Sequence, residues 1–388
     1  VKKKLSKLLS FKKTINMNLK IAVLSGDGIG PEVTEQAVKV LKAIAINYDH
    51  HFSFTPALVG AIAIDQLGDP LPESTLDVCR ANDSILFGAI GHPKYDNDPT
   101  SKVRPEQGLL KLRKELGLYA NIRPVKAYES LLGKSPLKKK IIKGTDISIY
   151  RELTGGIYFG EKKLSADGNT ASDLCQYSRY EIERISHLAF KAAKSRRQKV
   201  TLIDKANVLE SSRLWRKVVG ELAKDYPEIE LDYLFVDNAA MQMILNPTQF
   251  DVILTENLFG DVISDEASVI GGSIGLLASA SVGDKHSMFE PIHGSYPQAE
   301  GRGIANPIAS ILSAAMLLDH FELHKEAEMI RTAVEKSLKL NITTPDLNTK
   351  FDNISTSNVG DFIEDFINNP DDSNLNFKNM HLGQSTII

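Results

Sequence analysis

Residues 21–31 read Ile-Ala-Val-Leu-Ser-Gly-Asp-Gly-Ile-Gly-Pro, a short apolar run followed by a cluster of glycines and a proline. The apolar run at residues 21–24 predicts a buried strand, and a helix pattern follows from Pro31 to about Ile46. A strand that turns into a helix across glycines superficially suggests a dinucleotide fingerprint. The third glycine comes too early for that fingerprint, and Pro31 follows it. A tight turn with proline at the helix start explains the stretch, so a Rossmann domain is not predicted.

The alternation of strand and helix patterns continues along the chain. Apolar runs predict further buried strands, with helical patterns between them; the strands are at residues 84–89, 200–203, 234–236 and 252–254, and helices include 179–195 and 211–223. This order predicts an α/β protein whose largely parallel sheet is covered on both faces. A chain of 388 residues suggests two domains or one large α/β unit. Because no long linker divides the sequence, two domains would be joined by crossing segments.

Composition excludes several classes of partner. The formal net charge is -3, so no large basic surface for nucleic acid or an anionic membrane is expected. No apolar run has the length of a membrane span. Two cysteines cannot form a disulfide framework or a zinc motif, which fits a cytoplasmic protein. Residues 1–19 contain six lysines and no acid, and we interpret residues 1–16 as a basic extension or a misplaced start.

Arginines and leucines lie together at residues 104–124. On a helix, Leu109 would belong to a core stripe, with Glu106, Leu110 and Arg113 projecting beside it. Arg113 and Arg123 could both reach one anionic ligand, because a guanidinium pairs bidentately with a carboxylate. An apolar side chain next to an arginine suits a ligand that is part carboxylate and part hydrocarbon. The alternative is a solvated, charged helix face.

Two further segments carry candidate acid–base groups. Residues 151–160 read Arg-Glu-Leu-Thr-Gly-Gly-Ile-Tyr-Phe-Gly, which places Arg151 and Tyr158 around a glycine pair that a ligand can approach closely. Lys205 follows the strand at residues 200–203, where α/β sheets place active groups, and it is a candidate base. The alternatives are a β-turn with a core tyrosine and a solvated surface lysine.

Acidic residues form the strongest chemical signal. Asp237 follows one strand pattern, and residues 257–266, after the next, read Asn-Leu-Phe-Gly-Asp-Val-Ile-Ser-Asp-Glu. Asp261 and Asp265 share one helix face, where like charges repel unless a cation lies between them. The three aspartates could supply hard oxygen ligands to Mg²⁺ or Mn²⁺. The alternative is a helix N-terminus, whose dipole favours acids.

A glycine-rich segment follows residue 290. Residues 290–298 read Glu-Pro-Ile-His-Gly-Ser-Tyr-Pro-Gln, and residues 301–307 read Gly-Arg-Gly-Ile-Ala-Asn-Pro. The segment lacks a Walker lysine, but its backbone N–H groups could wrap a nucleotide. An ordinary surface loop is the alternative.

Together these segments resemble the β-decarboxylating dehydrogenases, the family of isocitrate and isopropylmalate dehydrogenases. The longest matches are residues 151–160 and 257–266, and the resemblance extends from about residue 17 to residue 366. It implies two α/β domains with an active cleft between them. The first domain, on the cofactor side, would comprise residues 17–118 and 272–388. The second, residues 119–271, would carry the metal site and the dimer interface.

The resemblance also implies a role for each candidate residue. Arg113, Arg123 and Arg151 would bind the substrate carboxylates, with further substrate contacts from Glu106, Leu109, Leu110, Val208 and Asp237. Tyr158 and Lys205 would be the catalytic acid and base. Asp237, Asp261 and Asp265 would bind the metal. NAD would be bound by Asn207, Glu290, His293, Gly294, Ser295, Gln298 and Asn306. In this family Lys205 and Asp237 would come from the partner subunit, so the active unit would be a homodimer with shared active sites.

The leucines decide the expected substrate. Isocitrate dehydrogenases place a serine and an asparagine on the helix where this chain has Leu109 and Leu110, and a leucine wall cannot pair with a third carboxylate. The resemblance therefore implies NAD-dependent oxidative decarboxylation of 3-isopropylmalate. A tartrate or D-malate dehydrogenase on the same scaffold is one alternative, and a nucleotide-binding regulatory protein without catalysis is another. Gln298 stands where NAD-using members usually have an aspartate, which implies a weaker hold on the ribose.

Overall fold

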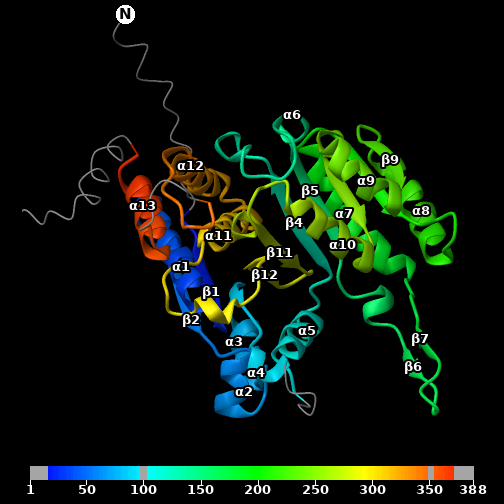
Figure 1. Cartoon of the computed structure of the whole chain (residues 1–388), viewed down its shortest axis with the longest axis horizontal. Helices are drawn as coiled ribbons and strands as arrows, with labels where there is room; N and C mark the ends of the chain where they lie inside the picture. The colour runs from blue at the N-terminus through cyan, green and yellow to red at the C-terminus, as the bar shows by residue number, and fades with distance from the viewer. Residues whose placement is uncertain (1–15, 97–102, 348–353, 371–388) are drawn as a thin grey trace, which may run out of the picture.

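The structure is a computed structural model that describes residues 16–96, 103–347 and 354–370 (Figure 1). The strands are β1 (Asn18–Gly26), β2 (His51–Pro56), β3 (Ser84–Ala89), β4 (Ala120–Lys126), β5 (Asp146–Glu152), β6 (Lys162–Leu164), β7 (Ala171–Asp173), β8 (Lys199–Asp204), β9 (Glu230–Phe235), β10 (Val252–Thr255), β11 (Ala278–Val282) and β12 (Ser287–Pro291). The α-helices are α1 (Gly30–Asn47), α2 (Ala61–Leu67), α3 (Glu73–Ala81), α4 (Pro93–Asp96), α5 (Pro105–Glu115), α6 (Lys139–Ile142), α7 (Arg179–Lys194), α8 (Glu210–Leu222), α9 (Val236–Leu245), α10 (Asn257–Ser268), α11 (Ile308–His320), α12 (His324–Leu340) and α13 (Thr356–Asn368). Residues 1–15 of the predicted basic extension lie outside the described residues.

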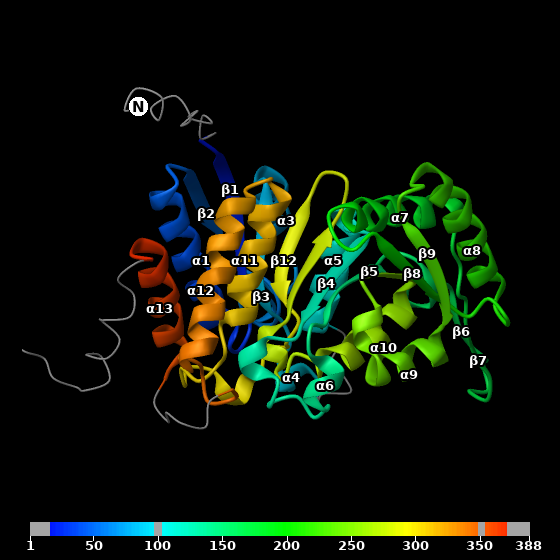
Figure 2. The ribbon, with the colours of Figure 1, turned by 90° about the horizontal axis from the view of Figure 1, so that it is seen from above.

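One continuous sheet runs through the molecule in the order β2-β1-β3-β12-β11-β4-β5-β10-β8-β9 (Figure 2). Its strands pair in parallel except at β11–β12, β11–β4 and β4–β5. The predicted α/β fold with a largely parallel sheet is therefore confirmed. Residues 119–271 contribute the half from β4 to β9, and the other half comes from the segments on either side of them. The chain thus crosses between the halves twice, while the division into two domains stays a prediction.

Helices cover both faces of each half of the sheet (Figures 1 and 2). In the first half, α1, α11, α12 and α13 bury one face around Ile311 and Phe362, and α3 and α5 bury the other around Leu112. In the second half, α7 and α8 pack through Trp215, and α9 and α10 pack through Met243. Within the described parts of the chain, no helix is long and apolar enough to cross a membrane.

One predicted strand boundary is wrong. The sequence predicts a strand at residues 234–236, but β9 stops at Phe235 and Val236 begins α9. Ala239 and Met243 are buried at helical spacing, and Asp237 lies in the first turn, where the helix dipole favours an acid. Asp237 therefore lies on a helix rather than at the end of a strand.

The glycines at residues 26–30 form the predicted tight turn between β1 and α1. Gly28 has a φ of +56°, and a Cβ there would lie 2.1 Å from the carbonyl oxygen of Ser295. The backbone N–H of Ile29 donates to that same oxygen at 2.8 Å. The Asp27 carboxylate accepts hydrogen bonds from the backbone N–H groups of Ala61, Ile62 and Gly91. The turn therefore holds the glycine-rich loop that follows β12.

We expect Gly28→Ala to destabilise the protein more than Gly68→Ala does. Both glycines have positive φ, so alanine costs about 1–2 kcal/mol at either position from backbone conformation alone. At Gly68 no described atom lies within 4 Å of the added Cβ, whereas at Gly28 the Cβ meets a backbone oxygen. Urea unfolding should show a further loss of roughly 1–3 kcal/mol for Gly28→Ala. Equal losses in the two variants would contradict the close approach of the two loops.

Candidate active site

The carboxyl ends of β5, β10, β8 and β9 lie at one edge of the sheet, because these strands are parallel. Arg151 lies near the end of β5, α10 begins two residues after β10, and Lys205 directly follows β8. This edge is where open α/β sheets bind ligands. Topology therefore gathers residues that are more than one hundred positions apart in the sequence.

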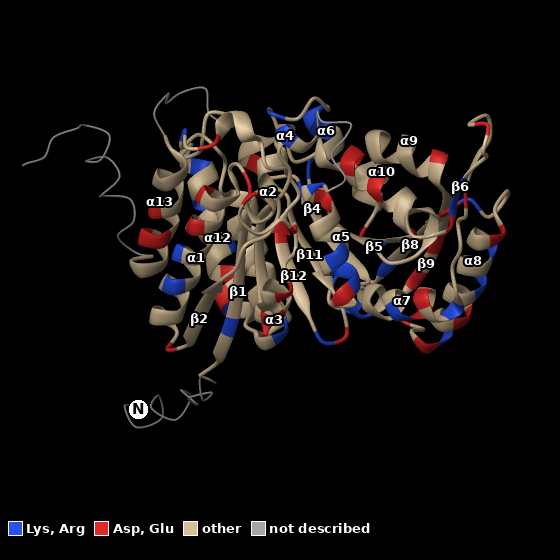
Figure 3. Cartoon of the chain, turned by 90° about the horizontal axis from the view of Figure 1, so that it is seen from below, with Lys and Arg blue, Asp and Glu red and all other residues tan. Residues whose placement is uncertain are grey.

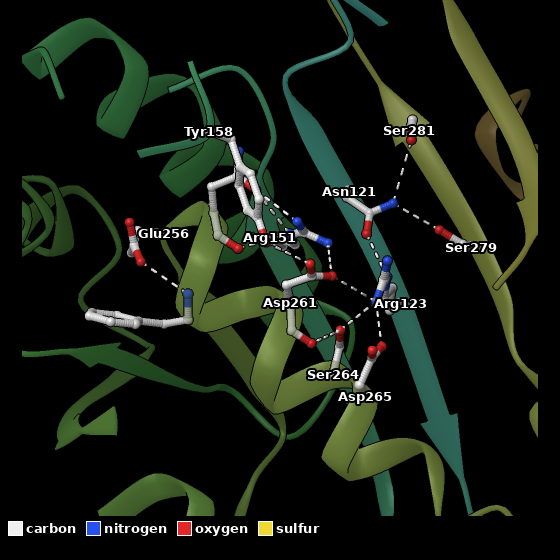
Figure 4. Close-up of polar contacts among 12 residues, drawn as sticks. Asn121, Arg123, Arg151, Tyr158, Glu256, Asp261, Ser264, Asp265, Ser279 and Ser281 are labelled. Carbon is white, nitrogen blue, oxygen red and sulfur yellow. Dashed lines mark hydrogen bonds and ion pairs between the residues drawn. The ribbon is translucent and has the colours of Figure 1, made fainter. Parts of the chain in front are cut away.

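Arg151 lies at the centre of the cluster in Figure 4. Its Nε and Nη2 donate to the Asn257 side-chain oxygen at 3.2 and 2.8 Å, and its Nη1 donates to the Asp261 carboxylate. The Tyr158 hydroxyl donates to the other oxygen of Asp261 at 3.0 Å. Burial lowers the pKa of Arg151 to about 10, with the neighbouring Arg123 adding to the effect. Burial and the Asp261 charge raise the pKa of Tyr158, which keeps its hydroxyl protonated and able to donate.

Arg123, on β4, lies next to this group. Its Nε donates to the Asn121 side-chain oxygen at 2.7 Å, and its Nη1 donates to Ser264 and, at 3.2 Å, to Asp265. The same Nη1 lies 3.8 Å from the Asp261 carboxylate. Burial lowers the pKa of Arg123, and the two aspartates oppose that effect. The guanidinium is therefore a largely buried charge whose Nη1 points toward α10.

Arg113, on α5, completes the arginine cluster from the other half of the sheet. Its Nη2 donates to the Glu290 carboxylate at 2.8 Å, and Glu290 is buried at the end of β12. The Arg113 charge contributes to the lowered pKa values of Arg123 and Arg151, so the guanidinium groups lie close together. Glu290, which the sequence suggested as an NAD contact, is thus the counterion of a predicted substrate-binding arginine.

The predicted metal ligands divide into two groups. Asp261 and Asp265 lie together on α10, where their oxygens are suited to a hard divalent cation. Asp237 lies on α9 and accepts a hydrogen bond from Lys205 Nζ, which lowers the pKa of Asp237. Among the described residues, no three His, Cys, Asp or Glu side chains are placed to hold a metal ion. One chain therefore does not bring the three aspartates together.

Asp261 and Asp265 have counterions that their helical spacing does not predict. The spacing alone predicts that the two like charges repel unless a cation lies between them. The structure places Arg151 against Asp261 and Arg123 against both aspartates. These guanidinium groups come from β5 and β4, and helix spacing cannot reveal them. The side chain of Asp265 remains 70% exposed, compared with 35% for Asp261, so Asp265 is the more accessible carboxylate.

The predicted α5 contacts occupy different environments. Leu112 is buried, Leu109 is partly buried against the same core cluster, and Leu110 is 49% exposed. Glu106 is exposed, and its carboxylate lies near Gly91, since a Cβ on that glycine would be 2.9 Å from it. Leu110 is therefore the apolar group on α5 that a ligand can reach.

The loop after β12 carries the other predicted cofactor residues. Its His293 Nδ1 lies 3.0 Å from the Gly294 carbonyl, and its Nε2 is buried with no hydrogen-bond partner among the described atoms. Burial lowers the pKa of His293, so the ring is neutral near pH 7. Ser295 is buried, whereas Gln298 is exposed. Asn306 donates to Asp346 and accepts from Ile308 N–H at the start of α11, which engages its side chain within the fold.

Asn207 and Val208 are both exposed, in the turn that follows Lys205.

Sequence reasoning missed the asparagines that hold the arginines. Asn121 precedes Arg123 by two positions, so both side chains lie on one face of β4. This two-residue spacing from Arg123 is the feature of the sequence from which a role for Asn121 could have been predicted. Asn257 opens α10 within a segment that had been singled out for its aspartates.

This geometry defines an α/β protein that gathers arginines and carboxylates at one edge of its sheet, a site suited to a small anionic ligand. The chain belongs to the isocitrate/isopropylmalate dehydrogenase family, whose sequence pattern matches residues 20–363. The resemblance inferred from the sequence is thereby confirmed.

Relatives named 3-isopropylmalate dehydrogenase match most of the chain. That of Bacteroides fragilis is 53% identical over 352 residues, which is 90% of this chain and 99% of the relative. That of Priestia megaterium is 56% identical over 336 residues, or 85% of this chain and 91% of the relative. Among solved structures, isocitrate dehydrogenase from Methylococcus capsulatus is similar with a TM-score of 0.80 and 35% identity, over 90% of this chain and 99% of that one. A β-decarboxylating dehydrogenase from Thermococcus kodakarensis has a TM-score of 0.75 and 37% identity, over 90% and 96% respectively.

We expect Asp261→Asn to destabilise the metal-free protein and Asp265→Asn to leave it nearly unchanged. The Arg151 side chain is only 8% exposed and would lose its carboxylate, which should cost roughly 2–4 kcal/mol. Asp265 is largely exposed, so its loss should stay within about 0.5 kcal/mol. Urea unfolding in EDTA measures both effects. An Asp261→Asn variant at least as stable as wild type would show that repulsion between the aspartates dominates.

Proposed function

We propose that this protein oxidises and decarboxylates 3-isopropylmalate to 4-methyl-2-oxopentanoate and CO₂ with NAD, in leucine biosynthesis. The observation that carries the proposal is the arginine–aspartate cluster together with the exposed Leu110, which lies about one helical turn before Arg113 on α5. Relatives more than 50% identical over most of the chain bear the name of that enzyme, which supports the same substrate.

The α5 helix favours this substrate over the alternatives. Isocitrate would bring a third carboxylate, and Leu110 offers it no hydrogen bond. D-Malate would leave the leucine without an apolar partner. Burying the three carbons of an isopropyl group contributes about 2 kcal/mol, which corresponds to roughly a thirtyfold preference over D-malate. Glu106 and Val208 are exposed and are proposed to complete the substrate pocket.

The chain's own residues then have separate tasks in the reaction. Arg113, Arg123 and Arg151 bind and orient the substrate carboxylates. Tyr158, whose pKa is raised above the ordinary tyrosine value and whose hydroxyl is therefore protonated, gives a proton to the carbon from which CO₂ departs. Lys205 takes the proton of the substrate hydroxyl. NAD, when bound, accepts the hydride.

Asp261 and Asp265 would hold Mg²⁺ or Mn²⁺, with Asp237 as the third carboxylate and a contact to the substrate. The donor set fits because carboxylate oxygens are the ligands these hard cations prefer. The metal, when bound, supplies Lewis-acid polarisation of the substrate oxygens. Arg123 and Arg151 would continue to balance the charge of the α10 aspartates.

The loop after β12 is proposed to bind the nucleotide. The buried, unpartnered Nε2 of His293 offers a polar atom to a ligand, and no described atom lies within 4 Å of a Cβ built on Gly294. Ser295, Asn207 and Asn306 are proposed as further contacts, and Glu290 reaches the site as the partner of Arg113. Gln298 is exposed and neutral, so it cannot form the charge-assisted bonds that an aspartate makes with a ribose.

Lys205 and Asp237 are proposed to serve the partner subunit's site in a homodimer. Neither residue has a described contact with Tyr158, Asp261 or Asp265 in its own chain. α9 and α10 pack side by side, as Figure 3 also shows, and several large apolar side chains are exposed on them and at Val269, which follows α10. The exposed side chains are Met241 (50%), Ile244 (43%), Leu245 (57%), Val262 (56%) and Val269 (42%). Exposed apolar groups gathered on adjacent helices mark an interface.

The cytoplasmic location stays a prediction.

The substrate is tested by NAD reduction with 3-isopropylmalate, D-malate and isocitrate, each with Mg²⁺ or EDTA. We expect kcat/KM to be highest for 3-isopropylmalate, by about thirtyfold over D-malate, and activity to be lost in EDTA. Leu110→Ala should reduce the ratio of kcat/KM for 3-isopropylmalate to that for D-malate without changing the KM for NAD. Faster turnover of D-malate than of 3-isopropylmalate would refute the proposed substrate, and full activity in EDTA would refute the metal requirement.

The shared site is tested by subunit mixing. Tyr158→Phe and Lys205→Met should each lower kcat at least a hundredfold as homodimers. Refolded together, they should regain activity, because one site in each mixed dimer combines an intact tyrosine with an intact lysine. As a matched control, the double variant refolded with wild type should give inactive mixed dimers. If those mixed dimers retain one active site in two, both residues serve the same chain.

A further inference from the structure

We propose that Asn121 is a positioning residue that fixes the guanidinium of Arg123 for the substrate carboxylate. The inference rests on the proposed function, because it assigns a role within the same site. Asn121 touches neither the aspartates nor Tyr158, and its described side-chain contacts are with Arg123 and with β11.

The strand register places Asn121 between the two halves of the sheet. On one side it lies opposite Ser281 of β11, and on the other it lies opposite Arg151 of β5. Directly opposed residues point to the same face of a sheet, as do residues two apart on one strand. The side chains of Ser281, Asn121, Arg151 and Arg123 therefore share one face. Asn121 is 1% exposed, so its polar atoms depend on these neighbours for hydrogen bonds.

The orientation of the amide is determined by its partners. The nitrogen lies 2.8 Å from Ser279 Oγ, 3.2 Å from the Ala280 carbonyl oxygen and 3.4 Å from Ser281 Oγ. A carbonyl only accepts, so the group facing Ala280 must be the donor. The side-chain oxygen then faces Arg123 and accepts from its Nε at 2.7 Å. With Nε held in this way, Nη1 reaches Ser264 and Asp265, as Figure 4 shows.

A neutral acceptor suits this position better than a carboxylate. The Arg123 side chain is 12% exposed. A carboxylate in place of the Asn121 amide would put a full negative charge beside Nε and would compete with a ligand carboxylate for the same guanidinium. The amide satisfies the buried N–H without adding a further carboxylate to the two aspartates that Nη1 already faces. Asn121 can therefore fix the direction of the arginine without neutralising it.

The same hydrogen-bond chain extends to the second arginine. The Ser281 hydroxyl donates to Glu290 Oε1 at 3.2 Å, and that oxygen accepts from Arg113 at 2.8 Å. Arg123 and Arg113 are thus joined through Asn121, Ser281 and Glu290, across the strands β4, β11 and β12. A dicarboxylate needs two cations at a defined separation, and this buried chain holds that separation.

Asn121→Leu removes the acceptor while keeping a similar volume. We expect the KM for 3-isopropylmalate to rise at least tenfold and the KM for NAD to change less than twofold. Ser279→Ala removes only the shortest bond to the amide and should raise the substrate KM about threefold, so it decides the matter if Asn121→Leu does not fold. The matched control is Ser84→Ala, which removes the buried hydrogen bond between Ser84 of β3 and Ser287 of β12 in the same sheet. It should leave both KM values unchanged.

A purely structural role would alter both KM values together, or would produce the same changes in Ser84→Ala, and either result overturns the inference. An unchanged substrate KM in Asn121→Leu and Ser279→Ala also overturns it. Wild-type turnover of 3-isopropylmalate tests the proposed function separately. If the wild type does not turn it over, thermal protection by D-malate with Mg²⁺ replaces KM as the readout. Weaker protection in Asn121→Leu than in Ser84→Ala supports the inference, and equal or absent protection in wild type and variants overturns it.

Discussion

Charge compensation of three arginines, Arg151 buried and Arg113 and Arg123 partly buried, is the constraint on which the site depends. Taking a guanidinium out of water costs several kcal/mol unless a carboxylate and hydrogen bonds replace the solvent. Arg151 has Asp261, and Arg113 has Glu290, while Arg123 faces Asp265 and Asp261 together. Each ion pair in the site therefore joins an arginine, which suits an anionic ligand, to a carboxylate, which suits a cation. A divalent cation on the aspartates and a dicarboxylate on the arginines would add equal and opposite charge, so joint binding would leave the net charge of the site unchanged.

The sheet explains how these pairs can form at all. Parallel strands bring Arg151, Lys205 and the start of α10 to one edge, because their carboxyl ends coincide. The antiparallel strands β11 and β4 join the two halves at the centre. That junction places Arg123 within reach of α10 while Asn121 holds it from the side of β11. The arginines thus belong to both halves, and their separation depends on how the halves are joined.

Local sequence patterns predicted the elements well but could not predict this compensation. Buried strands such as β3 are continuous apolar runs, and α10 carries its aspartates at helical spacing, so both are readable from neighbouring residues. The contact between Arg151 and Asp261 joins positions 110 apart, and that between Asn121 and Ser279 joins positions 158 apart. Such pairs are set by strand order, which periodicity does not encode. Helical spacing alone therefore predicts repulsion between aspartates that in fact have counterions, and it gives no sign of an asparagine that carries no charge.

The family resemblance proposes what the residues alone could not, namely which groups act together, and one chain does not bring the proposed metal ligands together. Lys205 and Asp237 pair with each other, and large apolar side chains are exposed on α9 and α10. The proposed base Lys205 has its described ion pair with Asp237 of its own chain, so the proposed mechanism needs a second chain to bring a lysine to the arginine cluster. A two-fold association through α9 and α10 would present this lysine and aspartate to the partner and receive the partner's in return, since such interfaces are self-complementary. Burial of the apolar helix faces and completion of the site would then be consequences of the same contact.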